Sequence, residues 1–319
     1  VVEIDFGMEV FIEWFFCGPT LGELASELCA QLGSSGKARG PVGRRPAPRG
    51  PTSLRAEAQL DPEITPRAGA DRGAPAARPS EILLTGATGF LGAFVLHELL
   101  ERTDARVHCL VRAATPREGL ERLEAVLRRY ALPTAGLGER VSCAPGDLAE
   151  PRLGLREGEF ERLAGTLDAI VHSGASVNFV FPYEALRAAN VGGTQEVLRL
   201  AASGRAKRVH HVSTIGVFPG GIGDLARVGE GSPLTETPER LPLGYMRAKW
   251  VAEGLVREAG ARGVPTSIYR PGTISGHSTT GAFNPDDFLC AMIKGCVELG
   301  VAPVVELRQH PWPLRVAVG

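Results

Sequence analysis

Thr85-Gly86-Ala87-Thr88-Gly89-Phe90-Leu91-Gly92 is the stretch that decides the fold of this 319-residue chain. It follows an apolar run at Glu81–Thr85 and opens a helical pattern near Phe90–Arg102. A glycine-rich turn between a strand and a helix can bring backbone N–H groups onto a pyrophosphate. In order along the chain, the three glycines allow a tight turn, the approach of the phosphate and the packing of the helix on the strand. The spacing G-x-x-G-x-x-G departs from the common G-x-G-x-x-G, so the prediction of a dinucleotide site depends on this context.

The chain repeats this alternation of strand and helix from Ser80 onward. Short runs rich in Val, Ile and Leu between helical periods are typical of βαβ units whose strands are buried on both faces. Because parallel crossovers are right-handed, the sequence predicts an α/β fold with a doubly wound parallel sheet. Beyond the first pair, we expect strands at Arg106–Val111, Arg140–Ala144, Asp168–His172, Arg208–Ser213 and Pro265–Tyr269, and helices near Pro116–Tyr130, Tyr183–Ala202 and Tyr245–Arg262.

Charge and composition argue against several classes of protein. Lys and Arg number 35 against 36 Asp and Glu, which disfavours a nucleic-acid binder or a polybasic membrane protein. No apolar run approaches the roughly 20 residues of a spanning helix, so we expect no membrane segment. None of the six cysteines forms C-x-x-C or a zinc-finger spacing with histidine. We therefore expect no metal site, free thiols and a cytoplasmic location.

Composition divides the chain into three regions. Residues 1–32 are apolar and acidic and contain a capping box at Thr20–Glu23 that predicts a short helix. Residues 33–79 hold 8 Pro and 7 Gly and cannot bury enough apolar surface to offset their ordering entropy, so we expect a disordered linker. This linker has no interleaved aromatic residue, which favours a solvated tether over a basic RNA-binding arm. Residues 80–319 carry the alternation of strand and helix.

The residue after the second strand predicts the choice of cofactor. NAD enzymes usually place an acid there for the ribose hydroxyls, whereas this chain has Arg112. A guanidinium pairs with a 2′-phosphate and stacks on adenine, which favours NADP(H) over NAD(H). A solvated strand-end arginine is the alternative. Asp147, in the turn after the third strand, is placed to reach the adenine amino group, although a plain turn aspartate would look the same.

A threonine, a tyrosine and a lysine form the third signal. Tyr245 and Lys249 are four residues apart on one helix face, and Thr214 follows the fifth strand, where a hydroxyl points into the cofactor crevice. A lysine one turn from a tyrosine lowers the pKa of the phenol and can hold the cofactor ribose, which makes the tyrosine a proton donor near neutral pH. This set predicts a reductase site. A serine hydrolase at Gly276–Thr280 is disfavoured because the second glycine of G-x-S-x-G is missing.

These residues resemble the extended short-chain dehydrogenase/reductase (SDR) superfamily. The similarity is greatest to the thioester reductase domains that end nonribosomal peptide and polyketide synthetases and carboxylic acid reductases. It covers about residues 80–303, and VNF followed by the AANVGGT helix is more specific than the glycine loop. The stretches that carry it are ILLTGATGFLGAFVLHELL, VHCLVRA, the GDL turn, DAIVHSGASVNF, LRAANVGGTQEVLRL, VSTIGVF, GYMRAKWVAEGLV and YRPGTISGHS.

The resemblance implies roles for individual residues. Thr214, Tyr245 and Lys249 resemble the catalytic triad of the superfamily, and Lys249 also matches a ribose contact. Asn190 resembles a helix asparagine beside the site, with a structural role. The implied cofactor is NADPH. The matching cofactor site comprises Thr85, Gly86, Thr88, Gly89, Phe90, Leu91, Gly92, Arg112, Asp147 and Leu148, with Gly174 and Ala175 beside the adenosine and Pro271 and Gly272 along the nicotinamide.

Both ends of the chain extend the resemblance. FGMEVFIEWFFCGPTLGELASEL is similar to the last third of a carrier protein, so we expect residues 1–32 to be a carrier remnant without its phosphopantetheine-bearing serine. AEAQLDPEITP resembles the usual lead-in to such reductases. After Pro303 the family continues into a substrate-binding subdomain that Val304–Gly319 does not resemble, so residues 80–319 are expected to form a C-terminally truncated reductase domain. The chain then resembles a fragment of a synthetase whose upstream modules share the polypeptide.

The expected function is NADPH-dependent reduction of a carrier-bound acyl or peptidyl thioester to an aldehyde or alcohol. Tyr245 and Thr214 would stabilise the developing oxyanion, and we expect the truncated chain to turn over little. A fatty acyl-CoA reductase, or a sugar-nucleotide dehydrogenase or epimerase, is the alternative enzyme on the same scaffold. The alternative from another class is an NADP-sensing binding protein without catalysis, although such proteins usually lose the tyrosine and the lysine.

Overall fold

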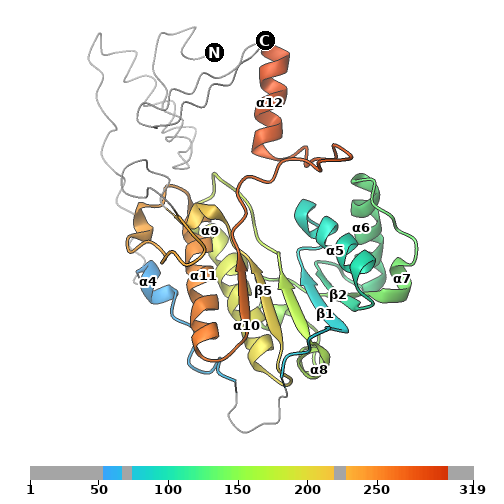
Figure 1. Cartoon of the computed structure of the whole chain (residues 1–319), viewed down its shortest axis with the longest axis vertical. Helices are drawn as coiled ribbons and strands as arrows, with labels where there is room; N and C mark the ends of the chain where they lie inside the picture. The colour runs from blue at the N-terminus through green and yellow to red at the C-terminus, as the bar shows by residue number, and fades with distance from the viewer. Residues whose placement is uncertain (1–52, 67–73, 219–227, 301–319) are drawn as a thin grey trace.

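A six-stranded, all-parallel sheet forms the centre of the molecule (Figure 1). The computed structural model describes residues 53–66, 74–218 and 228–300. The strand order is β3-β2-β1-β4-β5-β6, which confirms the predicted doubly wound α/β fold. Each strand lies within one residue of its expected bounds. The strands are β1 (Glu81–Thr85), β2 (Arg106–Val111), β3 (Val141–Pro145), β4 (Ala169–His172), β5 (Arg208–Val212) and β6 (Thr266–Tyr269).

Helices cover both faces of the sheet because successive side chains of a strand point to opposite sides. In β1, Leu83 and Leu84 are both fully buried but belong to different core clusters. Figure 1 shows the two helical layers on either side of the strands. The Leu84 cluster contains side chains of α5 (Phe90–Arg102), α6 (Pro116–Arg129) and α7 (Leu137–Arg140), and the Leu83 cluster contains side chains of α8 (Glu159–Thr166), α9 (Tyr183–Arg187), α10 (Gly193–Ala202) and α11 (Gly244–Ala261).

The strand order reverses at β1, which lies between β2 and β4. In the register of the sheet, Thr85 at the end of β1 is level with Leu110 of β2 and His172 of β4. The loops that follow these three strands therefore emerge side by side at the carboxyl edge. Open α/β sheets bind their ligands in the crevice at such a switch point.

The helix predicted at Tyr183–Ala202 is not a single α-helix. A π-helical turn at Ala188–Gly192 separates α9 from α10. Inside this turn the side chain of Asn190 forms two hydrogen bonds with the backbone of Ser176, at 2.7 and 3.0 Å. A π turn adds one residue to a helical turn and is frequent at functional sites. Apolar periodicity did not reveal this break, because the buried side chains continue through it.

Residues 53–66, which we call the N-terminal strap, correct the prediction of a linker that is disordered throughout 33–79. The strap begins with α4 (Leu54–Glu57) and lies against α11. Leu60 and Ile64 are 2% and 1% exposed within the Leu83 cluster. The guanidinium of Arg262 donates to the carbonyl oxygens of Leu60 and Ile64, at 2.6 and 3.0 Å. The prediction used the average composition of 33–79, so it overlooked the two buried side chains, Leu60 and Ile64, and the bonds from Arg262 to their backbone.

A further helix, α12 (Phe288–Leu299), was not predicted. Asp287 caps its N-terminus, because the carboxylate accepts the N–H of Leu289 at 2.9 Å, and the helix stands away from the sheet in Figure 1. None of its side chains is buried. In the described part of the chain, no helix is long and apolar enough to cross a bilayer. The predicted carrier remnant at 1–32, linker residues 33–52 and 67–73, and the final residues 301–319 lie outside the described residues.

Candidate active site

The loop between β1 and α5 has the backbone geometry of a phosphate cradle. Gly86 has φ 78°, and a Cβ placed on it would lie 2.7 Å from the Cα of Gly174, in the loop after β4. A Cβ on Gly92 would lie 1.9 Å from the carbonyl oxygen of Gly86. Side chains do not fit at these approaches, so glycine is required at both positions. The first turn of α5 carries no acidic residue, so an anion there meets the positive end of the helix dipole without an opposing charge.

The residues predicted to surround the adenosine lie where β2, β3 and β4 end. Arg112 is exposed at the cavity wall. The carboxylate of Asp147 accepts the N–H of Ala149 at 2.9 Å, so this side chain does have the role of a turn aspartate. Leu148 packs closely on Gly174, where a Cβ would lie 2.7 Å from Leu148 Cδ1. The pairing of Arg112 with a 2′-phosphate and the adenine role of Asp147 therefore both stay predictions.

The structure corrects the predicted cofactor site at Thr85, because this residue does not line the cavity. It is fully buried behind the glycine loop. Its hydroxyl oxygen accepts the N–H of Gly174 at 3.0 Å and lies 2.8 Å from Nδ1 of His172. Thr85 is the last residue of β1, level with His172 in the neighbouring strand, so its side chain points into the protein. Its role in this structure is to hold Gly174 against the loop.

Hydrogen bonds around His172 assign its tautomer. The Thr85 hydroxyl, which accepts from Gly174, lies against Nδ1 of His172, and the bond at the other ring nitrogen decides which of the two donates. The hydroxyl of Thr194 donates to the carbonyl of Asn190 at 2.7 Å, so its oxygen accepts from Nε2 of His172 at 3.0 Å. Burial and the nearby Lys249 lower the pKa of His172 to about 3, which keeps the ring neutral. The imidazole therefore links β1, β4 and α10 without carrying charge.

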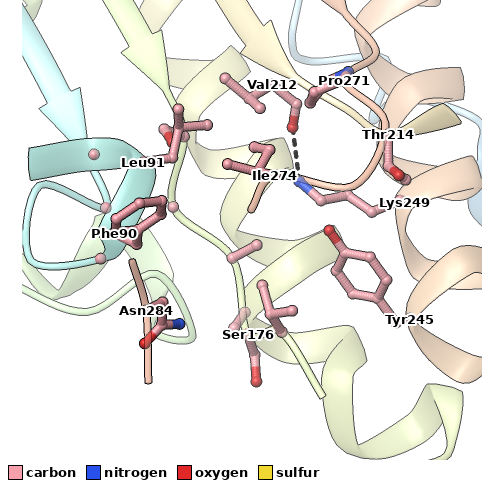
Figure 2. Close-up of a pocket in the computed structure, with 18 of the residues that line it drawn as sticks. Phe90, Leu91, Ser176, Val212, Thr214, Tyr245, Lys249, Pro271, Ile274 and Asn284 are labelled. Atoms are coloured by element: carbon pink, nitrogen blue, oxygen red, sulfur yellow. Dashed lines mark hydrogen bonds between the residues drawn. The ribbon is translucent and has the colours of Figure 1, made fainter. Parts of the chain in front are cut away.

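Tyr245, Lys249 and Thr214 lie at the other end of the cavity (Figure 2). Figure 2 shows the phenol oxygen of Tyr245 and the ammonium of Lys249 pointing into the cavity from α11. The ammonium donates to the carbonyl oxygen of Val212 at the end of β5, at 2.8 Å. Thr214 caps the short helical turn Ile215–Val217, and its side-chain oxygen accepts a backbone N–H at 3.1 Å. In that bond the Thr214 oxygen is the acceptor, so the turn does not use its hydroxyl proton.

Burial controls the pKa values of Tyr245 and Lys249. This corrects the prediction that Lys249 lowers the pKa of the phenol. Burial raises the pKa of Tyr245 to about 12, whereas the sequence predicted a lowering by Lys249. Lys249 is 4% exposed, and burial lowers its own pKa to about 8 against the opposing effect of Glu253. The ammonium is bonded to Val212 rather than to the phenol. Tyr245 therefore stays protonated through the working range of pH, and Lys249 is the group that titrates.

One cavity of about 850 Å³ joins the two ends of the site, a size typical of cofactor and ligand sites. Every residue of the predicted site lines it except Thr85. Within the described residues, no three His, Cys, Asp or Glu side chains are grouped so that they could hold a metal ion. The predicted residues that line the cavity are Gly86, Thr88, Gly89, Phe90, Leu91, Gly92, Arg112, Asp147, Leu148, Gly174, Ala175, Thr214, Tyr245, Lys249, Pro271 and Gly272.

Sequence reasoning missed two further groups of lining residues. One is the part of the loop after β4 that follows Ala175, where Phe179 meets the ring of Tyr245 edge-on at 5.7 Å between centroids. Its signal is the VNF stretch, which indicates the family but does not by itself predict a wall of the site. The other group lies between β6 and α12 and includes Ile274 and Asn284, both visible in Figure 2. Ile274 belongs to the YRPGTISGHS stretch, which indicated the family but not this contact, and no motif covers Asn284. Asn190 lies behind the wall and is 2% exposed, in agreement with a structural role.

A family model described as "Male sterility protein" matches residues 84–312, well over half of the chain. The match spans the glycine loop, Thr214, Tyr245 and Lys249. The chain belongs to this family. It is an NAD(P)-binding domain of the extended SDR type, and its family members include reductases, so the predicted family resemblance is confirmed.

Relatives and solved structures agree with this membership. A linear gramicidin synthase of Brevibacillus parabrevis is 49% identical over 221 residues, 69% of this chain and 4% of that protein. An isonitrile lipopeptide synthase of Streptomyces coeruleorubidus is 40% identical over 304 residues, 95% of this chain and 20% of that protein. The crystal structure of the terminal R domain from the myxalamid PKS-NRPS biosynthetic pathway is 51% identical, with a TM-score of 0.74. The similarity covers 79% of this chain and 64% of that domain, so the chain spans only part of each protein.

Proposed function

We propose that this chain performs the reductive release of a carrier-bound acyl or peptidyl thioester in the cytoplasm, with NADPH as reductant. The observation that carries the proposal is the single cavity in which a phosphate cradle and the Thr214, Tyr245 and Lys249 side chains meet. Similarity to a terminal R domain and to two synthases supports it. Because the chain spans part of those proteins, the carrier and the upstream modules belong to the proposal as well.

The residues of the cavity fit a bound NADPH. The cradle at Gly86 and the N-terminus of α5 would hold the pyrophosphate, and the close approach of Gly174 leaves this floor free of side chains. The exposed Arg112 would pair with the 2′-phosphate, which favours NADPH over NADH. Pro271 and Gly272 would lie along the nicotinamide. When bound, the cofactor supplies a hydride at this end of the cavity.

The side chains beside the nicotinamide act on the thioester carbonyl oxygen. Tyr245 is protonated, so its phenol donates a hydrogen bond to that oxygen and stabilises the negative charge that develops on it. The hydroxyl of Thr214 is the second donor. Hydride addition and one proton give a hemithioacetal. Its hydroxyl then gives up a proton as the C=O bond forms, the C–S bond breaks and the sulfur takes a proton, so that an aldehyde and a free thiol leave. A second hydride and proton would give the alcohol.

Lys249 supports this step without touching the oxygen. Its ammonium is held by the Val212 carbonyl, at the end of the strand that leads to Thr214. From there it would bind the cofactor ribose and keep a positive potential near the phenol. Tyr245 and Lys249 are arranged as in an SDR site. Burial gives Tyr245 a high pKa, so the tyrosine acts as an acid rather than as a phenolate.

Single-turnover assays with the purified chain test the proposal. Excess enzyme is mixed with NADPH and an N-acetylcysteamine thioester, and both the released thiol and the trapped aldehyde are measured. We expect equal amounts of the two products and loss of both in Tyr245→Phe. Parallel reactions with an acyl-CoA and a UDP-sugar address the alternative enzymes. NADPH binding without thiol release from any thioester, or turnover confined to the UDP-sugar, would contradict the proposal.

A further inference from the structure

Glu253 is a carboxylate without solvent access in the middle of α11. It is 0% exposed, and a buried charge is costly unless its oxygens are well bonded. The hydroxyl of Ser213 donates to Oε2 at 2.7 Å. Arg270 donates to both oxygens, from Nη2 to Oε1 at 2.7 Å and from Nε to Oε2 at 3.0 Å. Arg257, one turn further along α11, donates to Oε1 at 3.0 Å. Three donors from three parts of the chain thus meet one side chain outside the cavity.

Two of these donors directly precede residues of the candidate site. Ser213 is followed by Thr214, and Arg270 is followed by Pro271. Two backbone hydrogen bonds, of 2.7 and 3.0 Å, also join the segments that leave β5 and β6. Glu253 connects this pair of strand ends to α11, the helix that presents the tyrosine and the lysine. The position of Thr214 relative to α11 therefore depends on this carboxylate.

Glu253 also acts on the charge of Lys249, one turn earlier on α11. The direct partner of the ammonium is a neutral carbonyl. The titratable groups that face it from the sheet are His172 of β4 and His211 of β5, both buried with lowered pKa values, and Tyr245 on its own helix is protonated. Burial lowers the pKa of Lys249, and the charge of Glu253 opposes that lowering.

For Glu253 itself, burial would raise the pKa of the carboxyl, but the hydrogen bonds from Arg270 and Ser213 outweigh burial and hold it below the ordinary value. The carboxylate therefore stays negative across the range in which Lys249 titrates.

We propose that Glu253 is a positioning residue of the reductase: it holds the ends of β5 and β6 against α11 and supplies the negative charge that supports the ammonium of Lys249. The proposal rests on the proposed function and adds to it a residue that contacts neither cofactor nor thioester. Glu253 would have two separable effects. Its negative charge acts on the ammonium of Lys249, and its hydrogen bond from Ser213 fixes the position of the end of β5.

The charge effect is tested with Glu253→Gln, which keeps the shape of the side chain. NADPH binding is followed by fluorescence titration across pH, with thioester reduction in the same buffers and a thermal unfolding curve at each pH. We expect the alkaline midpoint of NADPH binding to move to lower pH by about one unit, because the lysine loses its favourable neighbour. Arg257→Gln is the matched control, since it removes one donor of the same cluster but keeps the carboxylate, and its midpoint should not fall below that of the parent.

A folded Glu253→Gln protein with the parental midpoint overturns the proposal. If this variant does not fold, Ser213→Ala decides: thioester turnover reduced about tenfold at unchanged NADPH affinity supports the positioning role, and parental turnover refutes it. The binding midpoint needs no substrate. If the parent chain binds NADPH but reduces no thioester, the proposed function fails, while the shift in Glu253→Gln still tests the role of the carboxylate.

Discussion

The ammonium of Lys249 lies 2.8 Å from the carbonyl oxygen of Val212, two residues before Thr214. This bond ties α11 to the end of β5 and holds the lysine in an almost closed environment. A neutral carbonyl compensates an ammonium less well than water does, so the pKa falls to about 8. The neighbouring Tyr245 keeps its proton to about pH 12. The site therefore contains one group that changes charge near neutral pH and one that does not.

The first prediction concerns pH. NADPH affinity and turnover should fall as pH rises through about 8, because Lys249 loses its proton there. The effect on folding has the opposite sign. Unfolded lysine keeps its proton to about pH 10.4, so between these values the unfolded state binds more protons, and this group adds to the free energy of unfolding as pH rises. NADPH affinity and the free energy of unfolding, measured in the same buffers, should therefore change in opposite directions as pH rises. A fall in both would contradict the pKa assigned to Lys249.

The second prediction concerns the proton donor. Tyr245→Phe should reduce thioester turnover roughly 10²- to 10⁴-fold and leave NADPH affinity almost unchanged, because the phenol acts on the transition state. Tyr183→Phe is the matched control: this buried tyrosine donates to Glu57 at 2.8 Å, away from the cavity, so its loss should lower stability and not turnover. Near-normal turnover in Tyr245→Phe would remove the tyrosine from the mechanism.

The third prediction concerns the glycine loop. Gly86→Ala should abolish NADPH binding and destabilise the fold, because the new Cβ would lie 2.7 Å from the backbone of Gly174. Gly136→Ala is the control for backbone strain alone: Gly136 has a similar φ, 72°, but no atom within 4 Å of an added Cβ. It should cost about 1–2 kcal/mol of unfolding free energy and leave NADPH binding intact. Equal behaviour of the two variants would mean that the close approach to Gly174 does not matter.

The fourth prediction concerns the N-terminal strap. Leu60→Ala should lower the free energy of unfolding by about 2–4 kcal/mol, since the side chain is buried in the Leu83 cluster. Glu63→Ala, on the exposed side of the strap, should change it by less than about 0.5 kcal/mol. Limited proteolysis should leave a stable fragment that still contains residues 53–66. A fragment that begins near Ser80 and unfolds like the parent would show that the strap adds nothing.

The fifth prediction concerns the choice of cofactor. Arg112→Asp should weaken NADPH about tenfold to a hundredfold and leave NADH affinity nearly unchanged, because the guanidinium pairs with the 2′-phosphate that NADH lacks. Arg117→Asp, at an exposed position on α6 outside the cavity lining, controls for the change in net charge. Equal affinity of the parent for the two cofactors would refute the role of Arg112.

Much of the fold and the site was predictable because it depends on local pattern. The six strands were placed within one residue, since apolar runs bounded by turns are short-range features. The glycine loop and the Tyr245–Lys249 spacing are likewise local, and the cavity contains both. The strap was missed because it depends on a partner far along the chain, Arg262, and the π turn was missed because the buried side chains continue through it.

The sequence by itself determined the order of strands and helices, the glycines of the loop and the residues with reactive groups, since these follow from residue type and spacing. Tertiary structure alone decided what those groups do. It placed Thr85 behind the loop, and it gave Tyr245 a raised pKa and Lys249 a lowered one. It also gathered Ser213 and Arg270 on Glu253. The physical reason is burial: desolvation and hydrogen bonding depend on which distant segments enclose a side chain, and no local pattern encodes that enclosure.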